Sequence, residues 1–200
     1  MKNALIYIHG KGGNAKEAEY YKKFFSREYD VIGLDYQSVF PWAAEVEFAK
    51  FFTSIAPRYS KISLIANSIG AYYAMLSLAD NPVAKAMFIS PIVDMEKVIL
   101  KIMARLNLSE EKLYQEKEIA TPFGETLSWE YLSYVRNHPI HWHIPTSILY
   151  AENDDMTSSE TITAFAKKTG ASLTIMQNGE HWFHTGEQMM FLDKWFTAFI

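Results

Sequence analysis

The sequence predicts an α/β fold, with a mostly parallel central sheet of about six strands and helices on both faces. Short apolar runs alternate with stretches of helical periodicity along most of the chain. Prolines and glycines mark several boundaries, and no linker, repeat or low-complexity tract divides the chain. The 200 residues suffice for one substantial core. We therefore expect a single domain over residues 1–200, with a helical insertion at residues 94–143, where the strand pattern is missing.

The apolar runs are the expected strands. They lie near residues 4–8, 30–35, 61–66, 84–90, 146–151 and 171–176. Helices are expected near residues 14–27, 42–56, 69–80, 158–169 and 186–199. Pro41 marks a helix start, and Asn81-Pro82 marks a helix end.

A serine stands between the third expected strand and the helix that follows it. The strand Lys61–Ile65 leads into Ala66-Asn67-Ser68-Ile69-Gly70, which matches G-x-S-x-G with alanine at the first glycine position. A sharp turn of this kind strains the backbone and exposes the hydroxyl at a helix amino end. The alternative is an ordinary N-cap, in which the Ser68 hydroxyl only satisfies free backbone N–H groups.

A glycine-rich loop, His9-Gly10-Lys11-Gly12-Gly13-Asn14, follows the first expected strand. Glycine lets the backbone approach a ligand closely. The loop could bind phosphate, but it fits neither the dinucleotide nor the Walker spacing, and no Lys-Ser/Thr pair closes it. We therefore expect no cofactor.

Two later loops carry an acid and a histidine. Asp154 and Asp155 follow the strand near residues 146–151, where either could orient a histidine or cap the next helix. His181 follows the strand near residues 171–176. The chain order is therefore serine, aspartate, histidine.

Taken together, these segments resemble the α/β-hydrolase superfamily over nearly the whole chain. The resemblance implies that Ser68 is the nucleophile, His181 the general base and Asp154 the acid. Asp154 is favoured over Asp155 because the family's acid follows a small residue and two variable ones. The resemblance also implies fewer strands than the family's usual eight, because the chain begins where the family's third strand would lie.

The resemblance extends to the oxyanion hole, where the backbone N–H groups of Lys11 and Ile69 are the implied donors. Gly12 is the alternative to Lys11. Asp94 is a rival acid, because some members carry the acid after the preceding core strand. His184 is the alternative base.

The implied activity is hydrolysis of a small or medium acyl ester or thioester through an acyl-enzyme. A serine at the elbow argues against alkyl-halide displacement, which requires a carboxylate nucleophile. Amide or peptide hydrolysis is the second choice. A binding protein that keeps the fold without turnover is the alternative from another class.

Residues 94–143 resemble the cap that covers the catalytic pocket in this family. Its aromatic residues could line an apolar acyl site or simply pack the cap against the core; they are Tyr114, Phe123, Trp129, Tyr131, Tyr134 and Trp142. We predict that Trp129 and Tyr134, together with Trp182, contact the substrate.

The remaining features exclude several partners. His138, His141 and His143 invite a metal site, but Pro139 disrupts helical spacing and no acid is adjacent, so none is expected. The net charge of −4 gives no basic stripe for nucleic acid. Without a long apolar segment, removable signal or cysteine, we expect no membrane association and a cytoplasmic location. The expected partner is a small acyl substrate, and the sequence does not predict the oligomeric state.

Overall fold

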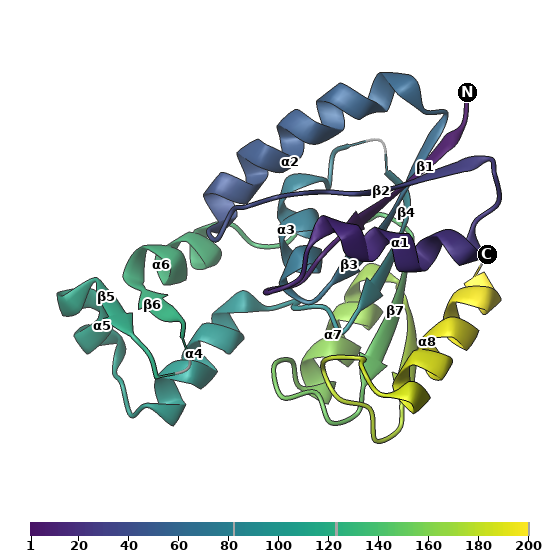
Figure 1. The fold of residues 1–200 in the computed structure, drawn as a ribbon. Coiled ribbons are helices and arrows are strands. Elements are labelled where there is room, and N and C mark those ends of the chain that lie inside the picture. The colour runs from purple at the N-terminus through teal and green to yellow at the C-terminus, as the bar shows by residue number, and fades with distance from the viewer. Residues whose placement is uncertain (82, 123, 200) are drawn as a thin grey trace. The chain divides into compact units, whose positions relative to one another are not determined.

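A computed structural model describes residues 1–81, 83–122 and 124–199 (Figure 1). The chain forms two compact units. The main unit consists of Met1–Val93 and His141–Ile200, and the insertion is Asp94–Ile140. The expected role of the insertion as a cap stays a prediction.

The main unit is built on a parallel sheet of six strands in the order β2-β1-β3-β4-β7-β8. The strands are β1 (Asn3–Ile8), β2 (Tyr29–Gly33), β3 (Lys61–Asn67), β4 (Val83–Ile89), β7 (Thr146–Ala151) and β8 (Ser172–Met176). The predicted fold class and strand count are confirmed. Because the strands are parallel, their carboxyl ends share one edge, and the loops that leave this edge carry the candidate site.

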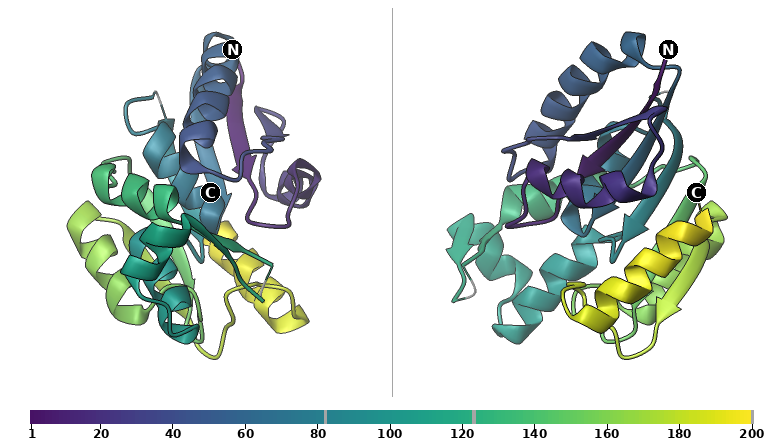
Figure 2. Two further views of the ribbon diagram at one scale, coloured as in Figure 1. Left: turned by 90° about the vertical axis from the view of Figure 1, so that its left-hand side faces the viewer. Right: turned by 45° about the vertical axis from the view of Figure 1, so that its right-hand side comes forward.

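Helices cover both faces of this sheet (Figure 2). They are α1 (Ala18–Tyr21), α2 (Pro41–Ile55), α3 (Ile69–Ser77), α7 (Ser159–Thr169) and α8 (Gly186–Phe199), with short 3-10 turns η1 (Ala15–Glu17), η2 (Lys22–Phe24) and η3 (Ala56–Arg58). The helices α1 and α8 pack on one face, where Tyr21 and Phe196 join a buried cluster with the strand residues Leu5 and Leu149. The other face carries α2, α3 and α7 (Figure 2).

One expected helix is wrong in form. Residues 14–27 make two 3-10 turns around a single α-turn, and this run ends at Phe24 because Phe25 is extended (φ −116°, ψ 139°). The ring of Phe25 packs on the ring of Tyr29, with the two centroids 5.2 Å apart. Phe25 also packs against the buried cluster of the main unit, so tertiary packing has overridden the helical periodicity here.

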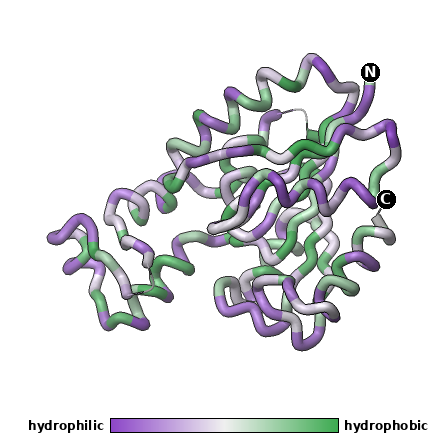
Figure 3. Tube along the Cα trace, in the orientation of Figure 1, coloured by the Kyte–Doolittle hydropathy of each residue, from purple (hydrophilic) through white to green (hydrophobic). Residues whose placement is uncertain are grey.

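Burial along the strands explains why their positions were predictable. β1 and β3 are each buried for five successive residues, as expected for parallel strands covered on both faces. In the tube of Figure 3 the central strands follow the hydrophobic stretches of the chain. The end strand β2 differs, since all of its residues are only half-buried.

The described residues of the insertion form three helices and a β-hairpin. Its elements are α4 (Met95–Arg105), α5 (Glu110–Glu116), β5 (Glu118–Ala120), β6 (Thr126–Ser128) and α6 (Trp129–Asn137). The insertion is mainly helical, and the sequence analysis did not anticipate its short hairpin, in which β5 and β6 pair antiparallel. Gly124, with φ of +80°, lets the chain reverse between strands of three residues, which are too short for a visible alternating pattern.

Candidate active site

Ser68 occupies the turn between β3 and α3. Its backbone has φ of 48° and ψ of −121°, a conformation that residues other than glycine rarely adopt. Backbone hydrogen bonds hold it there: its N–H donates to Ile89 (3.0 Å) and its C=O accepts from Ile92 (3.2 Å). The Ser68 side chain makes no capping bond to α3, so the N-cap alternative is wrong.

Small residues around the turn let two backbone segments meet. A Cβ at Gly70 would lie 2.3 Å from the carbonyl oxygen of His9, and one at Gly10 would lie 3.2 Å from the Cβ of Ser68. Ala66, at the first glycine position of the motif, is fully buried within β3. The glycine-rich loop therefore passes directly against the serine, and Gly70 is required for that approach.

His181 joins the serine to an acid. Its Nε2 lies 2.8 Å from Oγ of Ser68, and its Nδ1 lies 2.7 Å from Oδ2 of Asp154. Because a carboxylate only accepts hydrogen bonds, the Nδ1 atom carries the proton and Nε2 is left to accept from the serine hydroxyl. The structure thus brings together the serine, histidine and aspartate that the sequence indicated.

The carboxylate of Asp154 is fixed on both of its oxygens. Its side chain is fully buried, and Oδ1 accepts the N–H groups of Met156 (2.7 Å) and Thr157 (3.0 Å). These bonds satisfy a buried charge and leave Oδ2 facing the histidine. The pKa of the neighbouring Tyr150 is raised to about 12, first by burial and then by the negative charges of Asp154 and Glu160.

The alternative acids lie elsewhere. Asp155 is exposed, and the helix α7 is capped by Ser158 rather than by an aspartate. Asp94 caps α4 in the insertion, where it accepts the N–H of Lys97 at 3.1 Å and pairs with the ammonium of the same residue at 3.4 Å. The carboxylate that lies within hydrogen-bond distance of His181 is that of Asp154.

The loops after β7 and β8 are joined by hydrogen bonds, one between backbones and one to a side chain. Asn153 donates its N–H to Gly179 (2.9 Å), and Asn178 donates its N–H to the carboxylate of Glu152 (2.8 Å). Phe183 is buried just after the histidine and anchors the loop in the core. The loop of His181 is thus held to the loop of the acid.

His184, the alternative base, points elsewhere. Its Nδ1 lies 2.6 Å from the carbonyl oxygen of Trp182, and its ring stacks on the Trp182 indole at 4.6 Å. Trp182 is 74% exposed. Its expected contact with substrate stays a prediction.

Of the expected oxyanion donors, Ile69 follows the serine in the chain, and Lys11 follows Gly10, which passes against the serine. Ile69 begins α3, so its N–H is one of the four that have no acceptor within the helix. Lys11 lies in the turn closed by the bond from Gly13 N–H to Gly10 C=O (3.1 Å), and Gly12 has φ of +75°. The choice between Lys11 and Gly12 stays a prediction.

A partly buried polar network, which the sequence analysis missed, connects this loop to the elbow. Glu17 accepts the N–H of Asn14 at 3.1 Å and also accepts the hydroxyl of Tyr7, which in turn accepts the Asn67 amide at 2.9 Å. Asn67 directly precedes Ser68. The capping box formed by Asn14 and Glu17 is a sequence signal that could have pointed to it.

Tyr7 stays protonated in this network. Burial raises its pKa far above the ordinary value, and the nearby Tyr21 and Glu17 raise it further. The Tyr7 hydroxyl is therefore the donor in its bond to Glu17. We refer to Glu17, Tyr7 and Asn67 as the elbow brace.

The aromatic residues expected at the substrate site have local partners. In the insertion, Trp129 packs edge-on against Tyr114 at 5.2 Å, and Tyr134 stacks on His138 at 3.9 Å. Both remain predicted substrate contacts. Phe123 lies outside the described residues.

Trp142 belongs to the main unit rather than the insertion. It is buried, packs near Phe88 at 5.6 Å and donates its indole N–H to Thr146 at 2.7 Å. Within the described ranges, no cluster of three histidine, cysteine or acidic side chains could hold a metal ion. Nor does any helix among those residues combine the length and apolar character that crossing a bilayer requires.

Comparisons with solved structures identify the architecture. The esterase Est1E from Butyrivibrio proteoclasticus superposes with a TM-score of 0.76 at 15% identity, over 99% of this chain and 86% of that chain. The α/β hydrolase domain-containing protein 10 from mouse gives 0.71 at 14% identity, over 98% and 90%. A proline iminopeptidase-related protein from Thermus thermophilus gives 0.64 at 18% identity, over 98% and 89%.

No protein-family model matches the sequence, and none of the curated proteins matches it. The likeness is therefore one of fold. The chain has the α/β-hydrolase fold, as its resemblance implied.

Proposed function

We propose that this protein is a serine hydrolase that cleaves a small or medium acyl ester or thioester through an acyl-enzyme intermediate. One observation carries the proposal: His181 lies within hydrogen-bond reach of both Ser68 and Asp154, with the serine at a strained turn. Nucleophile, base and orienting acid then stand in the arrangement that acyl transfer requires.

Each residue has a defined role in the proposed reaction. The Ser68 oxygen attacks the acyl carbonyl while its proton moves to Nε2 of His181, and Asp154 stabilises the imidazolium. The imidazolium then protonates the departing alkoxide or thiolate, and a water deprotonated by the same nitrogen releases the acid. The N–H groups of Ile69 and Lys11 are the proposed donors to the oxyanion.

Covalent labelling and ester turnover test this proposal. We expect a fluorophosphonate probe to label the wild type on Ser68 and to leave the folded Ser68→Ala variant unlabelled. Turnover of p-nitrophenyl esters should disappear in the same variant. A folded wild-type protein that neither reacts with the probe nor hydrolyses esters would instead support the non-catalytic binding alternative.

The acyl group is proposed to be apolar. Each buried methylene should improve transition-state binding by about 0.8 kcal/mol until the pocket is full, so kcat/KM should rise and then fall with chain length. Because ferulic acid has been bound to Est1E, a feruloyl ester belongs in the same series. Equal rates along the series would contradict an apolar acyl pocket.

The insertion is proposed to act as a cap and to contribute to that specificity. Trp129 and Tyr134 of the insertion and Trp182 of the main unit are the proposed contacts, and replacing each by alanine should raise KM for the preferred ester. Tyr114→Ala is the matched control, since this exposed ring packs on Trp129. If the control alters KM as much as the other three, direct contact is excluded.

Amide hydrolysis remains the second candidate. It differs from ester hydrolysis in the leaving group, which must be protonated as nitrogen before it departs. Matched ester and anilide substrates with one acyl group separate the two, and we expect a preference for the ester. A higher kcat/KM on the anilide would reassign the enzyme as an amidase.

A further inference from the structure

The strand β4 lies between the strand that carries the serine and the strand that carries the acid, in the order β3-β4-β7. His181 spans the two, with Nε2 2.8 Å from Oγ of Ser68 and Nδ1 2.7 Å from Oδ2 of Asp154. Because the imidazole ring is rigid, both bonds form only when the serine and the carboxylate stand at one separation. The segment that follows β4 is placed to set this separation.

That segment, which we call the β4 corner, is Ile89–Ile92, and it is buried throughout. On one side, its first residue accepts the N–H of Ser68 (3.0 Å), and its last residue donates its N–H to the C=O of Ser68 (3.2 Å). On the other side, Ser90 donates its N–H to Leu149 of β7 (2.8 Å). The β4 corner is therefore bonded both to the serine turn and to the strand that leads to the acid.

Thr157 ties the β4 corner to the loop of the acid. Its side chain is buried, and its hydroxyl donates to the C=O of Pro91 at 3.1 Å. Its N–H donates to Oδ1 of Asp154 at 3.0 Å, and its C=O accepts the hydroxyl of Tyr150 at 2.9 Å. Among the described residues, no other hydrogen bond reaches the Pro91 carbonyl. Thr157 is thus held from three directions while it holds the carboxylate.

We propose that Thr157 is a positioning residue for the reaction. Its hydroxyl joins the acid loop to the β4 corner and so fixes Asp154 at the distance from Ser68 that His181 requires. This role rests on the proposed function, because placement of the three groups acts on the rate of acyl transfer. A threonine that only satisfied a buried carbonyl would affect stability alone.

Replacing Thr157 by valine and by serine tests the hydroxyl. Thr157→Val keeps nearly the same shape but cannot donate to Pro91, so the acid loop loses its tie to the β4 corner. We expect kcat for the best ester to fall about tenfold or more with KM nearly unchanged, because the placement of the acid changes and the acyl pocket does not. Thr157→Ser keeps the hydroxyl and should retain kcat within about twofold of wild type.

A matched control separates placement from the loss of a buried hydroxyl. Thr146 begins β7 at its amino end, is also buried and also donates to a backbone carbonyl, that of Ile144 at 2.7 Å. Thr146→Val should therefore lower the free energy of unfolding without changing kcat. Denaturant unfolding measures the stability of both valine variants. An equal loss of kcat in Thr146→Val and Thr157→Val would overturn the proposal.

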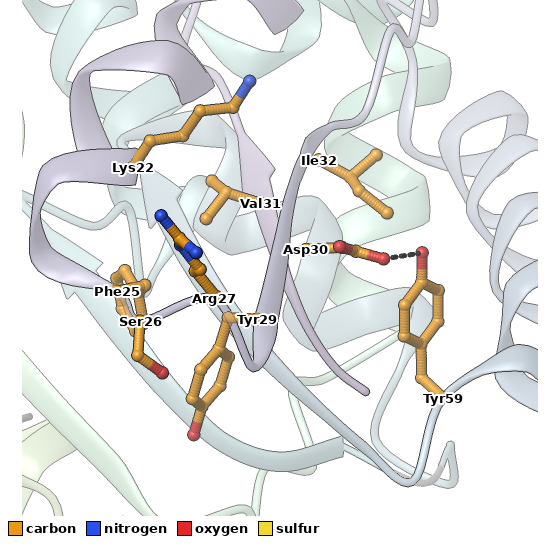
Figure 4. Close-up of a pocket in the computed structure, with 9 residues that line it drawn as sticks. All are labelled: Lys22, Phe25, Ser26, Arg27, Tyr29, Asp30, Val31, Ile32 and Tyr59. Atoms are coloured by element: carbon orange, nitrogen blue, oxygen red, sulfur yellow. Dashed lines mark hydrogen bonds between the residues drawn. The ribbon is translucent and has the colours of Figure 1, made fainter. Parts of the chain in front are cut away.

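Tyr150→Phe tests the same placement by a second route, because it removes the bond to the Thr157 carbonyl while the ring stays in the core. We expect kcat to fall about threefold or more, including in the case that Thr157→Val does not fold. The control is Tyr59→Phe, which should keep full activity. The Tyr59 hydroxyl bonds Asp30 at 3.2 Å in a groove beside β2, which residues 29–32 also line (Figure 4).

A double-mutant cycle tests whether Thr157 acts through the acid. In the Asp154→Asn background, Thr157→Val should slow fluorophosphonate labelling of Ser68 by less than about twofold, because the carboxylate that Thr157 holds is already gone. Fully additive losses would show that the hydroxyl acts elsewhere, and would overturn the proposal.

The proton on Nδ1 of His181 gives a readout that needs no turnover. Its NMR resonance should lie far downfield in the wild type, because this proton bonds the buried carboxylate of Asp154. The resonance should move upfield or broaden in Thr157→Val and stay in place in Thr157→Ser. An unchanged resonance in the valine variant would overturn the proposal, as would a smaller loss of kcat than expected or a serine variant as impaired as the valine one. A wild type that shows these shifts but neither labels nor hydrolyses esters would contradict the proposed function alone.

Discussion

Two regions of the molecule differ in the contacts that were described within them: the candidate site of the main unit, and the insertion. The loops of Asp154 and His181 are fixed by backbone bonds beside buried strands, and the serine turn is fixed by Ile89 and Ile92. In the insertion, the exposed side chain of Arg136 joins two helices by bonding Glu96 (2.6 Å) and Glu110 (2.7 Å). Such surface contacts contribute little free energy, so the insertion depends mainly on its buried apolar side chains, among them Met103, Leu113 and Leu132.

The largest expected effect concerns the serine and histidine. Ser68→Ala and His181→Ala should each lower kcat for the best ester by about 10⁴-fold or more, because these residues act as one unit. The double variant should be scarcely worse than either single one. Steady-state kinetics with circular dichroism as a fold control measures this. A single variant within tenfold of wild type would exclude its residue from the proposed role.

Asp154→Asn should lower kcat by about 10³–10⁴-fold, because an amide favours the wrong histidine tautomer. Asp155→Asn is the matched control and should keep full activity, since that carboxylate is exposed. Comparable losses in the two variants would remove the assignment of the acid. Asp94→Asn would then be the next variant to measure.

Tyr7→Phe breaks the elbow brace while the ring stays in the core. We expect kcat to fall about tenfold to a hundredfold with KM nearly unchanged, because the contact acts on the placement of the turn and its loop. Binding of a boronic acid, which forms a tetrahedral adduct, should weaken in parallel. Tyr20→Phe is the control, because the Tyr20 hydroxyl also bonds an acid, but that acid is Asp193 of α8 and not a residue of the elbow brace. Equal losses in both variants would indicate general destabilisation.

The smallest effect concerns the ion pairs of the insertion. Arg136→Ala should destabilise the insertion by well under 1 kcal/mol, because the pairs are exposed. The hydrogen bond from Arg136 holds the pKa of Glu110 below its usual value, so its stabilisation is present at neutral pH and is lost as the pH falls through that lowered pKa. Hydrogen exchange in α5 and α6 should accelerate at pH 7 in the variant, and its difference from wild type should shrink as Glu110 becomes protonated at acid pH. Acceleration that persists unchanged at acid pH would show that Glu110 is not the partner.

The parts of the fold that were predictable are those with continuous burial. β1 and β3 appear in the sequence as unbroken apolar runs, and the positions of Ser68, Asp154 and His181 at their strand ends follow from chain order. The parts that were missed depend on contacts distant in sequence. The break in the first helix reflects the packing of Phe25 against the buried cluster of the main unit. The elbow brace joins Asn67 to a residue fifty positions earlier in the chain, Glu17.

The strained turn at Ser68 has a consequence for engineering. A positive φ at a residue with a side chain costs on the order of 1–3 kcal/mol, and glycine removes this cost at the expense of some unfolded-state entropy. Ser68→Gly should therefore have a free energy of unfolding about 1 kcal/mol higher than that of Ser68→Ala, which denaturant unfolding measures. Neither variant can form an acyl-enzyme. A thermostability screen blind to activity would thus tend to select the loss of the nucleophile.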